Sequence, residues 1–212
     1  MKIVLLGGSG YVGKGIIQTL NTHPDIHLVS MSRHGGTAAQ KEEWPNVNWV
    51  SVDLYNSETW RKEIIDADWI VDLIGVLFAK NYNEYYQKTV APVMNIIKFI
   101  EKEKLAAKFL FVSANYAPIG MKNYLKAKLV LERELKERLG IKTVIVYPGL
   151  IYHKERPSVY IIGKSLKILT RLKIFNRFIT PLRPISRGKF ASEIENVIVG
   201  KDSYLTKRNI GS

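Results

Sequence analysis

The sequence predicts an α/β protein: a doubly wound parallel sheet followed by a small, partly helical C-terminal appendage. Two observations lead to this prediction. Apolar runs of strand length alternate with segments of helical periodicity over the first 150 residues, and a glycine-rich turn directly follows the first run. The runs span residues 2–6, 27–31, 47–52, 69–73, 108–112 and 142–146. The ligand site of such a sheet lies beyond the carboxyl ends of its strands.

Segments with helical spacing lie between most of these runs, at residues 57–66, 83–104 and 121–139. Asn56 or Ser57 can cap the first of them, and Gly140 stands where the last helix needs a left-handed residue at its end. A strand of continuous apolar, β-branched character that is followed by a helix belongs to a sheet covered on both faces. The pattern therefore indicates helices on both sides of the sheet.

The C-terminal part is organised differently. Beyond residue 149 the alternation gives way to a basic stretch interrupted by prolines. A helix is expected at residues 188–199 and a short last strand near Tyr204. We divide the chain into a core, residues 1–150, and a small basic lobe, residues 151–212, that completes the same domain.

Composition excludes several classes of protein. The chain has 212 residues, 46% of them hydrophobic, and no cysteine, so a disulfide scaffold and thiolate metal sites are ruled out. His23 and His27 have the i, i+4 spacing of a metal pair, but Pro24 between them argues against a helix that would align them, so no metal site is expected. No apolar stretch reaches the ~18 residues that span a bilayer, and the opening run is too short for a secretion signal, so we expect a cytoplasmic protein. The net charge is +13, and residues 154–189 carry ten basic residues against one acid. The basic character is therefore local.

A glycine turn follows the first strand. Gly7, Gly10 and Gly13 have GxxGxxG spacing, in which the first permits a tight turn, the second lets the backbone approach a pyrophosphate, and the third lets the helix pack closely. The helix that begins here offers its N–H groups to phosphates. A P-loop for nucleotide hydrolysis is the alternative, but Gly15 stands where that motif needs the hydroxyl of Ser or Thr. The turn therefore favours a dinucleotide.

The end of the second strand bears on which dinucleotide is bound. NAD sites usually have an acid there, whereas NADP sites place an arginine there for the 2′-phosphate. This strand ends in Ser32 and Arg33, with no acid before Glu42. Arg33 can form a charge-assisted pair with a phosphate and Ser32 can donate beside it, which favours NADP (NADPH) over NAD. Asp53, which closes the third strand, is expected near the adenine ring.

Tyr124 and Lys128 form a YxxxK motif after the fifth strand. Residues i and i+4 share one face of a helix, so the phenol and the ammonium are expected to lie together. A nearby cation lowers the pKa of a tyrosine, which makes the phenol a better proton donor to a substrate carbonyl at neutral pH. Tyr160 and Lys164 have the same spacing but lie in the basic stretch, whereas Tyr124 follows Ser113 at the carboxyl edge of the sheet. Tyr124 is therefore the candidate.

Taken in order, these motifs resemble the short-chain dehydrogenase/reductase superfamily, whose core is a Rossmann fold. The similarity is stronger to its atypical branch, which contains the nucleotide-binding accessory subunit of respiratory complex I and epimerase-like proteins. The resemblance runs from residue 1 to roughly residue 199. It rests on the glycine turn and the YxxxK motif, together with residues 53–54, 71–75, 111–114 and 147–152.

The resemblance implies a role for each matching residue. Tyr124 would be the general acid, with Lys128 bonded to the nicotinamide ribose and Ser113 beside the substrate. The implied cofactor contacts are Gly7, Gly10, Tyr11, Val12 and Gly13 at the pyrophosphate, Ser32 and Arg33 at the ribose phosphate, Asp53 and Leu54 at the adenine, Gly75 at the ribose, and Pro148, Gly149 and Leu150 at the nicotinamide.

One position departs from the family. Catalytic members usually carry a second Ser or Thr after the fifth strand, and this chain has Ala114 there, so Ser113 or Asn115 would have to polarise the substrate. Two functions stay open. One is an NADPH-dependent oxidoreductase that acts on a carbonyl or hydroxyl substrate. The other is a non-catalytic NADPH-binding module, structural or sensing, that is docked to a membrane or a protein partner.

The basic stretch at residues 158–180 approximates an amphipathic helix. Such a helix can lie on an anionic membrane surface, which would make the protein peripheral to a membrane. Alternatively, its apolar face covers the sheet and its lysines are solvated. Nucleic acid is a third partner for the charge, but no recognised nucleic-acid motif supports it.

Overall fold

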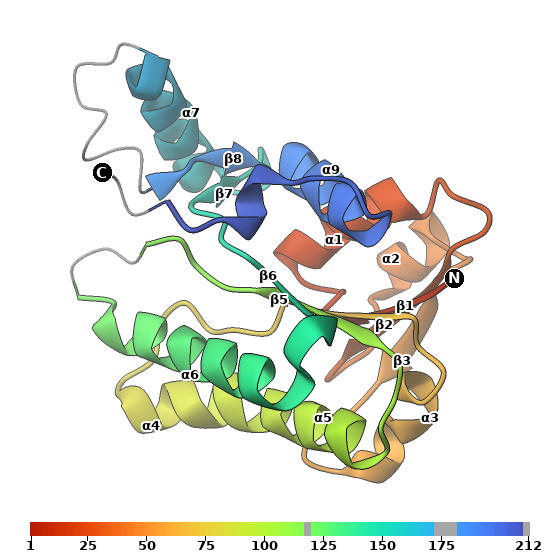
Figure 1. Ribbon diagram of the computed structural model, residues 1–212. Coiled ribbons are helices and arrows are strands. Elements are labelled where there is room, and N and C mark those ends of the chain that lie inside the picture. The colour runs from red at the N-terminus through yellow and green to blue at the C-terminus, as the bar shows by residue number, and fades with distance from the viewer. Residues whose placement is uncertain (117–119, 172–181, 210–212) are drawn as a thin grey trace.

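A six-stranded parallel sheet with the strand order β3-β2-β1-β4-β5-β6 forms the centre of the molecule (Figure 1). The computed structural model describes residues 1–116, 120–171 and 182–209. The strands are β1 (Lys2–Leu6), β2 (His27–Ser32), β3 (Asn48–Ser51), β4 (Trp69–Asp72), β5 (Lys108–Val112) and β6 (Thr143–Val146). Every strand end lies within one residue of the sequence prediction. The order reverses between β1 and β4, so the doubly wound Rossmann topology is confirmed.

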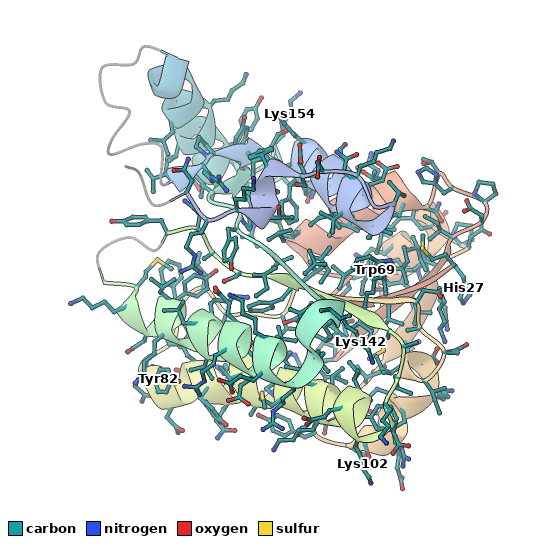
Figure 2. All side chains as sticks on the ribbon, viewed as in Figure 1. His27, Trp69, Tyr82, Lys102, Lys142 and Lys154 are labelled. Carbon is teal, nitrogen blue, oxygen red and sulfur yellow. The ribbon has the colours of Figure 1, made fainter. Side chains whose placement is uncertain are left out.

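Helices cover both faces of this sheet, as predicted (Figure 1). One face carries α1 (Tyr11–Leu20), α2 (Ala38–Glu43) and α9 (Arg187–Ile198). The other carries α3 (Arg61–Ile64), α4 (Tyr82–Tyr85), α5 (Ala91–Lys102) and α6 (Lys122–Leu139). Successive strand residues point to opposite faces, so Ile3 and Leu5 pack against Phe190 of α9, whereas Val4 and Leu6 belong to the core under α5 and α6. Figure 2 shows side chains filling both layers.

The predicted helix at 83–104 is interrupted. A wider turn of the i to i+5 type spans Tyr86–Val90 between α4 and α5. Pro92 stands in the first turn of α5 and has no N–H to donate to the carbonyl four residues earlier, so the preceding turn widens. The predicted helix at 57–66 is also split, at Trp60, into a 3₁₀ turn, Ser57–Thr59, and α3. The buried Trp60 indole packs edge-on against Phe99, with 5.3 Å between ring centroids.

Two predicted helix ends are confirmed and the predicted last strand is wrong. The side chain of Asn56 accepts from the Glu58 N–H at 3.1 Å, and Gly140 has φ +54°. Near Tyr204 the chain forms a 3₁₀ turn, Tyr204–Thr206, because the Ser203 hydroxyl caps the Leu205 N–H locally. A local side-chain hydrogen bond therefore replaces the expected pairing.

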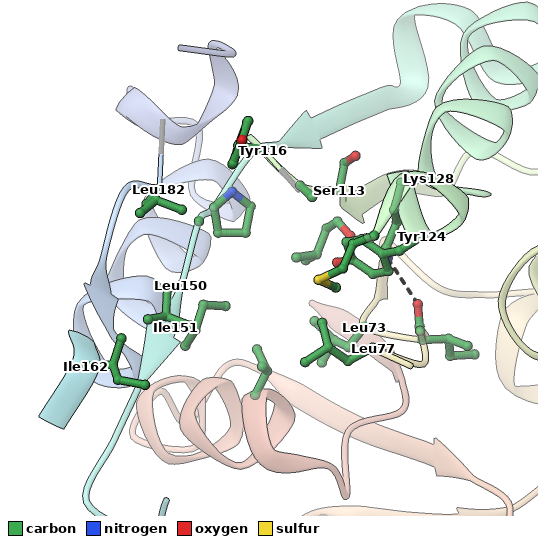
Figure 3. A pocket seen from close by; sticks show the side chains of 18 of the residues that line it. Leu73, Leu77, Ser113, Tyr116, Tyr124, Lys128, Leu150, Ile151, Ile162 and Leu182 are labelled. Carbon is green, nitrogen blue, oxygen red and sulfur yellow. Dashed lines mark hydrogen bonds between the residues drawn. The ribbon is translucent and has the colours of Figure 1, made fainter. Parts of the chain in front are cut away.

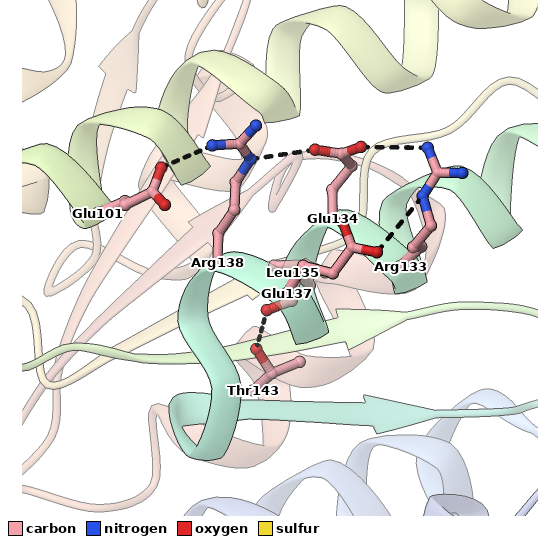
Figure 4. Close-up of polar contacts among 7 residues, drawn as sticks. All are labelled: Glu101, Arg133, Glu134, Leu135, Glu137, Arg138 and Thr143. Carbon is pink, nitrogen blue, oxygen red and sulfur yellow. Dashed lines mark hydrogen bonds and ion pairs between the residues drawn. The ribbon is translucent and has the colours of Figure 1, made fainter.

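Ion pairs fix α6 against its neighbours at its C-terminal end (Figure 4). Arg138 donates to Glu134 at 3.0 Å and to Glu101 of α5 at 2.8 Å. The Thr143 hydroxyl, at the start of β6, donates to the Leu135 carbonyl at 3.0 Å. These contacts set the rotation of α6, and with it the face that its first half presents to the carboxyl edge of the sheet.

The C-terminal lobe consists of α7 (Pro157–Arg171), the short parallel pair β7 (Ile151–Tyr152) and β8 (Ile185–Ser186), and α9. The helix expected from the amphipathic pattern is present up to residue 171, and residues 172–180 of that pattern lie outside the described residues. Within the described ranges no helix is both long and apolar enough to cross a membrane.

Candidate functional site

The glycine turn has the close contacts that its spacing predicts. Gly7 has φ +82°, and a Cβ on Gly13 would stand 2.2 Å from the Gly8 carbonyl oxygen. At Gly10 a Cβ would lie 3.1 Å from the Gly7 oxygen, to which the Gly10 N–H donates at 3.0 Å. Gly8 was missed by the sequence analysis: its Cβ would meet the Ser30 hydroxyl of β2 at 2.5 Å. The positive φ at Gly7 and the lack of room at Gly8 and Gly13 favour glycine at these positions, and the contact at Gly10 is tight.

The N-terminus of α1 faces the carboxyl edge of the sheet with its first N–H groups unpaired by side chains. Gly10 is the N-cap, no side-chain cap hydrogen bond is present, and the first turn has no acidic residue. Such an end attracts an anion. The turn is braced from α2, where Gln40 forms a capping box with Thr37 and donates to the Ser9 carbonyl at 3.0 Å.

Tyr11 contributes to the turn through its backbone. The guanidinium groups of Arg156 and Arg187 cover its ring at 4.3 and 5.3 Å, so the side chain is directed into the C-terminal lobe. Arg187 also explains Gly15, where a Cβ would lie 2.6 Å from Arg187 Cγ. The glycine that departs from the P-loop motif therefore has a packing reason.

A first cavity of about 540 Å³ extends from the glycine turn to the ends of β2 and β3. The Asp53 carboxylate accepts from the Tyr55 N–H at 2.9 Å, and the Tyr55 hydroxyl donates to the Gln87 carbonyl at 2.6 Å. The predicted residues that line this cavity are Gly7, Gly10, Ser32, Arg33, Asp53, Leu54 and Gly75. His34, Tyr55, Gln87 and Lys88 also line it and carried no motif by which the sequence could identify them.

A second cavity of about 500 Å³ lies beside the first, at the ends of β4, β5 and β6 (Figure 3). The predicted residues that line it are Val12, Gly75, Ser113, Tyr124, Lys128, Pro148, Gly149 and Leu150. Leu73, Ile74 and Gly75 line both cavities, so the two form one groove along the carboxyl edge of the sheet. Of the predicted site residues, only Tyr11 and Gly13 line neither cavity.

Lys128 is buried between β4 and β5. Its Nζ donates to the Ile74 carbonyl at 3.2 Å and to the Val112 carbonyl at 2.9 Å. Gly75 makes room for it, because a Cβ there would stand 3.3 Å from Nζ. Burial lowers the pKa of Lys128, opposed by the carboxylate of Asp72. The ammonium is therefore held by backbone oxygens, and two of its three N–H bonds are used by them.

Asp72, at the end of β4, is fully buried. Burial raises its pKa to about 6, against the opposing effects of Lys128 and of the Ile74 N–H, which donates to Oδ1 at 2.8 Å. Its Oδ2 has no hydrogen-bond partner among the described residues. A fully buried acid is thus located beside the lysine of the YxxxK motif.

The expected lowering of the Tyr124 pKa is wrong. Burial raises the pKa of Tyr124 to about 12, and Tyr85, whose ring centroid is 6.4 Å away, adds to the increase. Lys128 does not offset this effect, because its ammonium is directed to the two carbonyls. The phenol therefore keeps its proton at neutral pH and stands in the second cavity as a hydrogen-bond donor.

The residues after β5 are arranged unequally. Ser113 lines the second cavity, but its hydroxyl donates to the buried Glu132 carboxylate of α6. Ala114 lines the cavity as an apolar wall. Asn115 does not line it, and its side chain bonds instead to the backbone of Asn209. Neither the Ser113 hydroxyl nor the Asn115 amide is therefore directed into the cavity to replace the donor that Ala114 lacks.

Gly149 sits where the C-terminal lobe crosses the core. A Cβ there would stand 1.6 Å from the Leu182 carbonyl oxygen, which accepts from the Leu150 N–H at 2.9 Å. Tyr160 and Lys164, the competing YxxxK pair, lie on α7 and line neither cavity. The two YxxxK motifs are thus separated by position, as expected.

Comparisons with known proteins agree with this geometry. The family model described as NAD(P)H-binding matches residues 7–174. A curated relative from Arabidopsis thaliana, "Uncharacterized protein At1g32220, chloroplastic", is 27% identical over 87% of this chain, which spans 63% of that relative's length. The relatives' activities therefore carry over only as proposals.

Solved structures share the fold. The oxidoreductase ylbE from Lactococcus lactis has a TM-score of 0.64 and 18% identity, with 94% of this chain and 85% of that one covered. The UDP-glucuronic acid 4-epimerase from Bacillus cereus, solved in complex with NAD, has a TM-score of 0.62 and 20% identity, with 79% and 64% covered. The family match includes the glycine turn, the YxxxK motif and nearly all of the groove, and the chain therefore belongs to the NAD(P)H-binding family, with the Rossmann fold of the atypical short-chain dehydrogenases/reductases.

Proposed function

We propose that the protein is an NADPH-dependent oxidoreductase that acts on a carbonyl or hydroxyl substrate. The observation that carries this proposal is the continuous groove formed by the two cavities, which meet at Leu73, Ile74 and Gly75. One end is bounded by the glycine turn and Arg33, and the other by Tyr124 and Lys128. The groove thus has two parts, and a dinucleotide likewise has two halves, an adenosine half and a nicotinamide half.

The residues present fit this cofactor. The α1 N-terminus and the glycines, which leave no room for a Cβ, suit a pyrophosphate, with Gly7, Gly10, Val12 and the Tyr11 backbone at its oxygens and Gly13 shaping the turn. Asp53 and Leu54 would flank the adenine, Gly75 the ribose, and Pro148, Gly149 and Leu150 the nicotinamide.

When bound, the nicotinamide supplies or accepts a hydride. The protein's own residues then handle the proton. Tyr124 lines the apolar cavity with its proton in place, so it would donate to a carbonyl oxygen as the hydride arrives at carbon, although burial raises its pKa and makes it a weaker acid than an exposed tyrosine. The third N–H of Lys128 is left to bind a ribose hydroxyl. The walls of the cavity are largely aliphatic and offer water few hydrogen-bond partners beside this step.

Arg33 supports the preference for NADPH over NADH. Arg33 and Ser32 both line the first cavity. The Ser32 hydroxyl donates to the Gly35 carbonyl at 2.6 Å, which fixes the loop after β2. No acidic side chain of β2 competes for the ribose hydroxyls. A guanidinium in this place suits a phosphate dianion.

A thermal-shift comparison of NADPH, NADH, ATP and buffer tests the cofactor. NADPH at about one hundred times its Kd should stabilise the fold by about 2.7 kcal/mol and raise the Tm by about 5–10 °C. Arg33→Ala should abolish the preference for NADPH over NADH. Lys41→Ala, which removes an exposed cation of α2 outside both cavities, should preserve it. Equal shifts with NADH and NADPH in the wild type would contradict the preference.

A non-catalytic NADPH-binding module is the second candidate. Ala114 and the bonding of Ser113 to Glu132 favour it, because the hydroxyl donors left on the substrate side among the described residues are then the phenols of Tyr124 and Tyr116. Tyr124→Phe separates the two. Under the oxidoreductase proposal it lowers kcat by about 10²–10⁴-fold with NADPH affinity nearly unchanged. Tight NADPH binding without oxidation by any member of a carbonyl panel would support the module.

Peripheral contact with an anionic membrane is also proposed. Ile161 and Ile162 of α7 are 64% and 54% exposed, and Phe78 in the loop after β4 is 77% exposed. Ile162 lines the second cavity, so this apolar surface borders the site. The protein should co-float with anionic vesicles at low salt and be released at high salt. Failure to co-float at low salt would refute the contact.

A further inference from the structure

The C-terminal segment returns to the substrate side of the groove after α9. Leu205 is fully buried, and its carbonyl accepts from the Tyr147 N–H at 2.7 Å, immediately beyond β6. Arg183 donates to the Lys207 carbonyl at 2.8 Å and to the Tyr147 carbonyl at 3.3 Å. Residues 203–209, the C-terminal strap, are thus bonded to the chain next to Pro148, which lines the second cavity.

Arg208 of this strap is the ion-pair partner of a buried acid. Its guanidinium pairs with the carboxylate of Glu132 and stacks on the Tyr147 ring, with 4.6 Å from Cζ to the centroid. Glu132 lies on α6 one turn beyond Lys128 and two turns beyond Tyr124, so the three share a helix face. A buried carboxylate that lost its cationic partner would be strongly destabilised. Arg208 therefore fixes the charged end of this face.

The same carboxylate holds Ser113. The Ser113 hydroxyl donates to Glu132 Oε1, and the same oxygen accepts a hydrogen bond from Arg208. The Tyr147 hydroxyl donates to Glu132 Oε2 at 3.3 Å. The direction of the Ser113 O–H bond is thus set by Glu132, while the residue itself lines the second cavity.

A second contact ties the strap to the same loop. Asn209 N–H donates to Asn115 Oδ1 at 2.7 Å, and Asn115 Nδ2 donates to the Asn209 carbonyl at 2.6 Å. The backbone N–H of Asn115 donates to the Pro148 carbonyl at 2.9 Å. The strap therefore contacts the loop after β5 directly at Asn115, and it is linked to Ser113 through Glu132.

We propose that the C-terminal strap is part of the active site and that Arg208 is a positioning residue, which acts through Glu132 to hold Ser113 and the loop after β5 in register with Tyr124. Because Tyr124 carries the proposed reaction and Ser113 lines the same cavity, the catalytic side of this role rests on the proposed function. The structural side does not, and it can be measured without turnover.

Hydrogen–deuterium exchange of the wild-type chain, Arg208→Ala, Arg208→Lys and Lys207→Ala tests the structural side. Lys207 is exposed and its side chain has no hydrogen bond or ion pair among the described residues, so it is the matched control. Arg208→Ala should speed exchange at Asn115 and Leu205 at least tenfold while exchange in β1 is unchanged. Arg208→Lys should restore part of the protection, and Lys207→Ala should match the wild type. Unchanged exchange at Asn115 in Arg208→Ala would overturn the proposal.

A kinetic cycle tests positioning, with NADPH oxidation by para-nitrobenzaldehyde as the probe. Arg208→Ala should lower kcat by about 10- to 100-fold and leave the KM for NADPH unchanged. In a Ser113→Ala background the same change should have little further effect, because the two residues act on one step. Fully additive losses would refute action through Ser113.

Two further outcomes are also decisive. If Arg208→Ala does not fold, Glu132→Gln is used in its place, because it keeps the shape of the side chain and removes the charge. This variant should likewise speed exchange at Asn115 and in the strap. If the wild type shows no turnover with any carbonyl, the oxidoreductase proposal fails. The exchange result then still supports or refutes the structural role of the C-terminal strap, because it does not depend on turnover.

Discussion

Asp72 makes a residue-scale prediction about pH. Its folded-state pKa is raised from 3.8 to about 6 by burial, so between these values the folded protein binds a proton that the unfolded chain releases. Stability contributed by this group is therefore complete below pH ~4 and is lost as the pH rises through about 6, by on the order of 2–3 kcal/mol. Asp72→Asn should remove this part of the pH dependence.

The measurement is urea unfolding from pH 4 to pH 8. The stability of the wild type relative to Asp72→Asn should fall over this range, and Asp202→Asn, at an exposed position, should follow the wild type. Parallel curves for wild type and Asp72→Asn would mean that the carboxyl is ionised in the fold throughout. The Lys128 ammonium would then neutralise it.

Individual residues also show which parts of the site can be predicted from a sequence. Gly7, Gly10, Tyr124 and Lys128 were found because their spacing along one turn or one helix determines where they lie. Glu132 and Arg208 were missed because they are 76 positions apart and meet only through the fold. The direction of the Tyr124 pKa was wrong for a related reason: spacing predicts a nearby ammonium, but it does not reveal burial or the two carbonyls that bind that ammonium.

At the scale of elements, Gly149 and Gly188 make a matched pair. A Cβ at Gly149 would stand 1.6 Å from the Leu182 carbonyl oxygen, whereas a Cβ at Gly188, in the first turn of α9, would meet no atom within 4 Å. Gly149→Ala should force apart the two segments that line the second cavity and destabilise the protein by more than 1 kcal/mol. Gly188→Ala should stabilise it by about 0.5–1 kcal/mol, because alanine favours the helix and restricts the unfolded chain.

Urea unfolding of both variants tests this pair, and NADPH affinity gives a second readout. Gly149→Ala should weaken NADPH binding because it displaces Pro148 and Leu150, while Gly188→Ala should leave it unchanged. If Gly149→Ala were as stable as the wild type, the crossing of the lobe over the core would be looser than its contacts indicate.

Elements were predictable where their periodicity was strong. All six core strands were located because their apolar runs are bounded by polar residues, and β1, β2, β4 and β5 are also buried on both faces. The interruptions of the helices could not be predicted from periodicity. The wide turn before Pro92 depends on one missing N–H, and the break at Trp60 depends on one buried indole. The predicted last strand was wrong because the Ser203 hydroxyl accepts a local hydrogen bond from the Leu205 N–H, whereas a strand would need a neighbouring strand to pair with.

At the scale of the whole molecule, we propose that residues 151–212 complete the same domain as residues 1–150. Phe190 and Ile194 of α9 share a core with Ile3 and Leu5 of β1, and Leu205 belongs to the same cluster. The Arg187 guanidinium ties Glu155 to the Tyr11 carbonyl at the start of α1. Removing the lobe would expose the apolar face of α1, so the two parts should unfold together.

This cooperativity can be measured because all four tryptophans, Trp44, Trp49, Trp60 and Trp69, lie in the first part of the chain. Their fluorescence reports on the core, while hydrogen exchange in α9 reports on the lobe. The urea midpoints from both probes should coincide, and NADPH should raise both by the same amount. The transition of α9 would come first if the lobe were a separate unit, and NADPH would then shift the tryptophan transition without moving that of α9. Coincidence of the probes would establish that the strap, the lobe and the glycine turn form one cooperative structure, in which the cofactor stabilises residues that it does not contact.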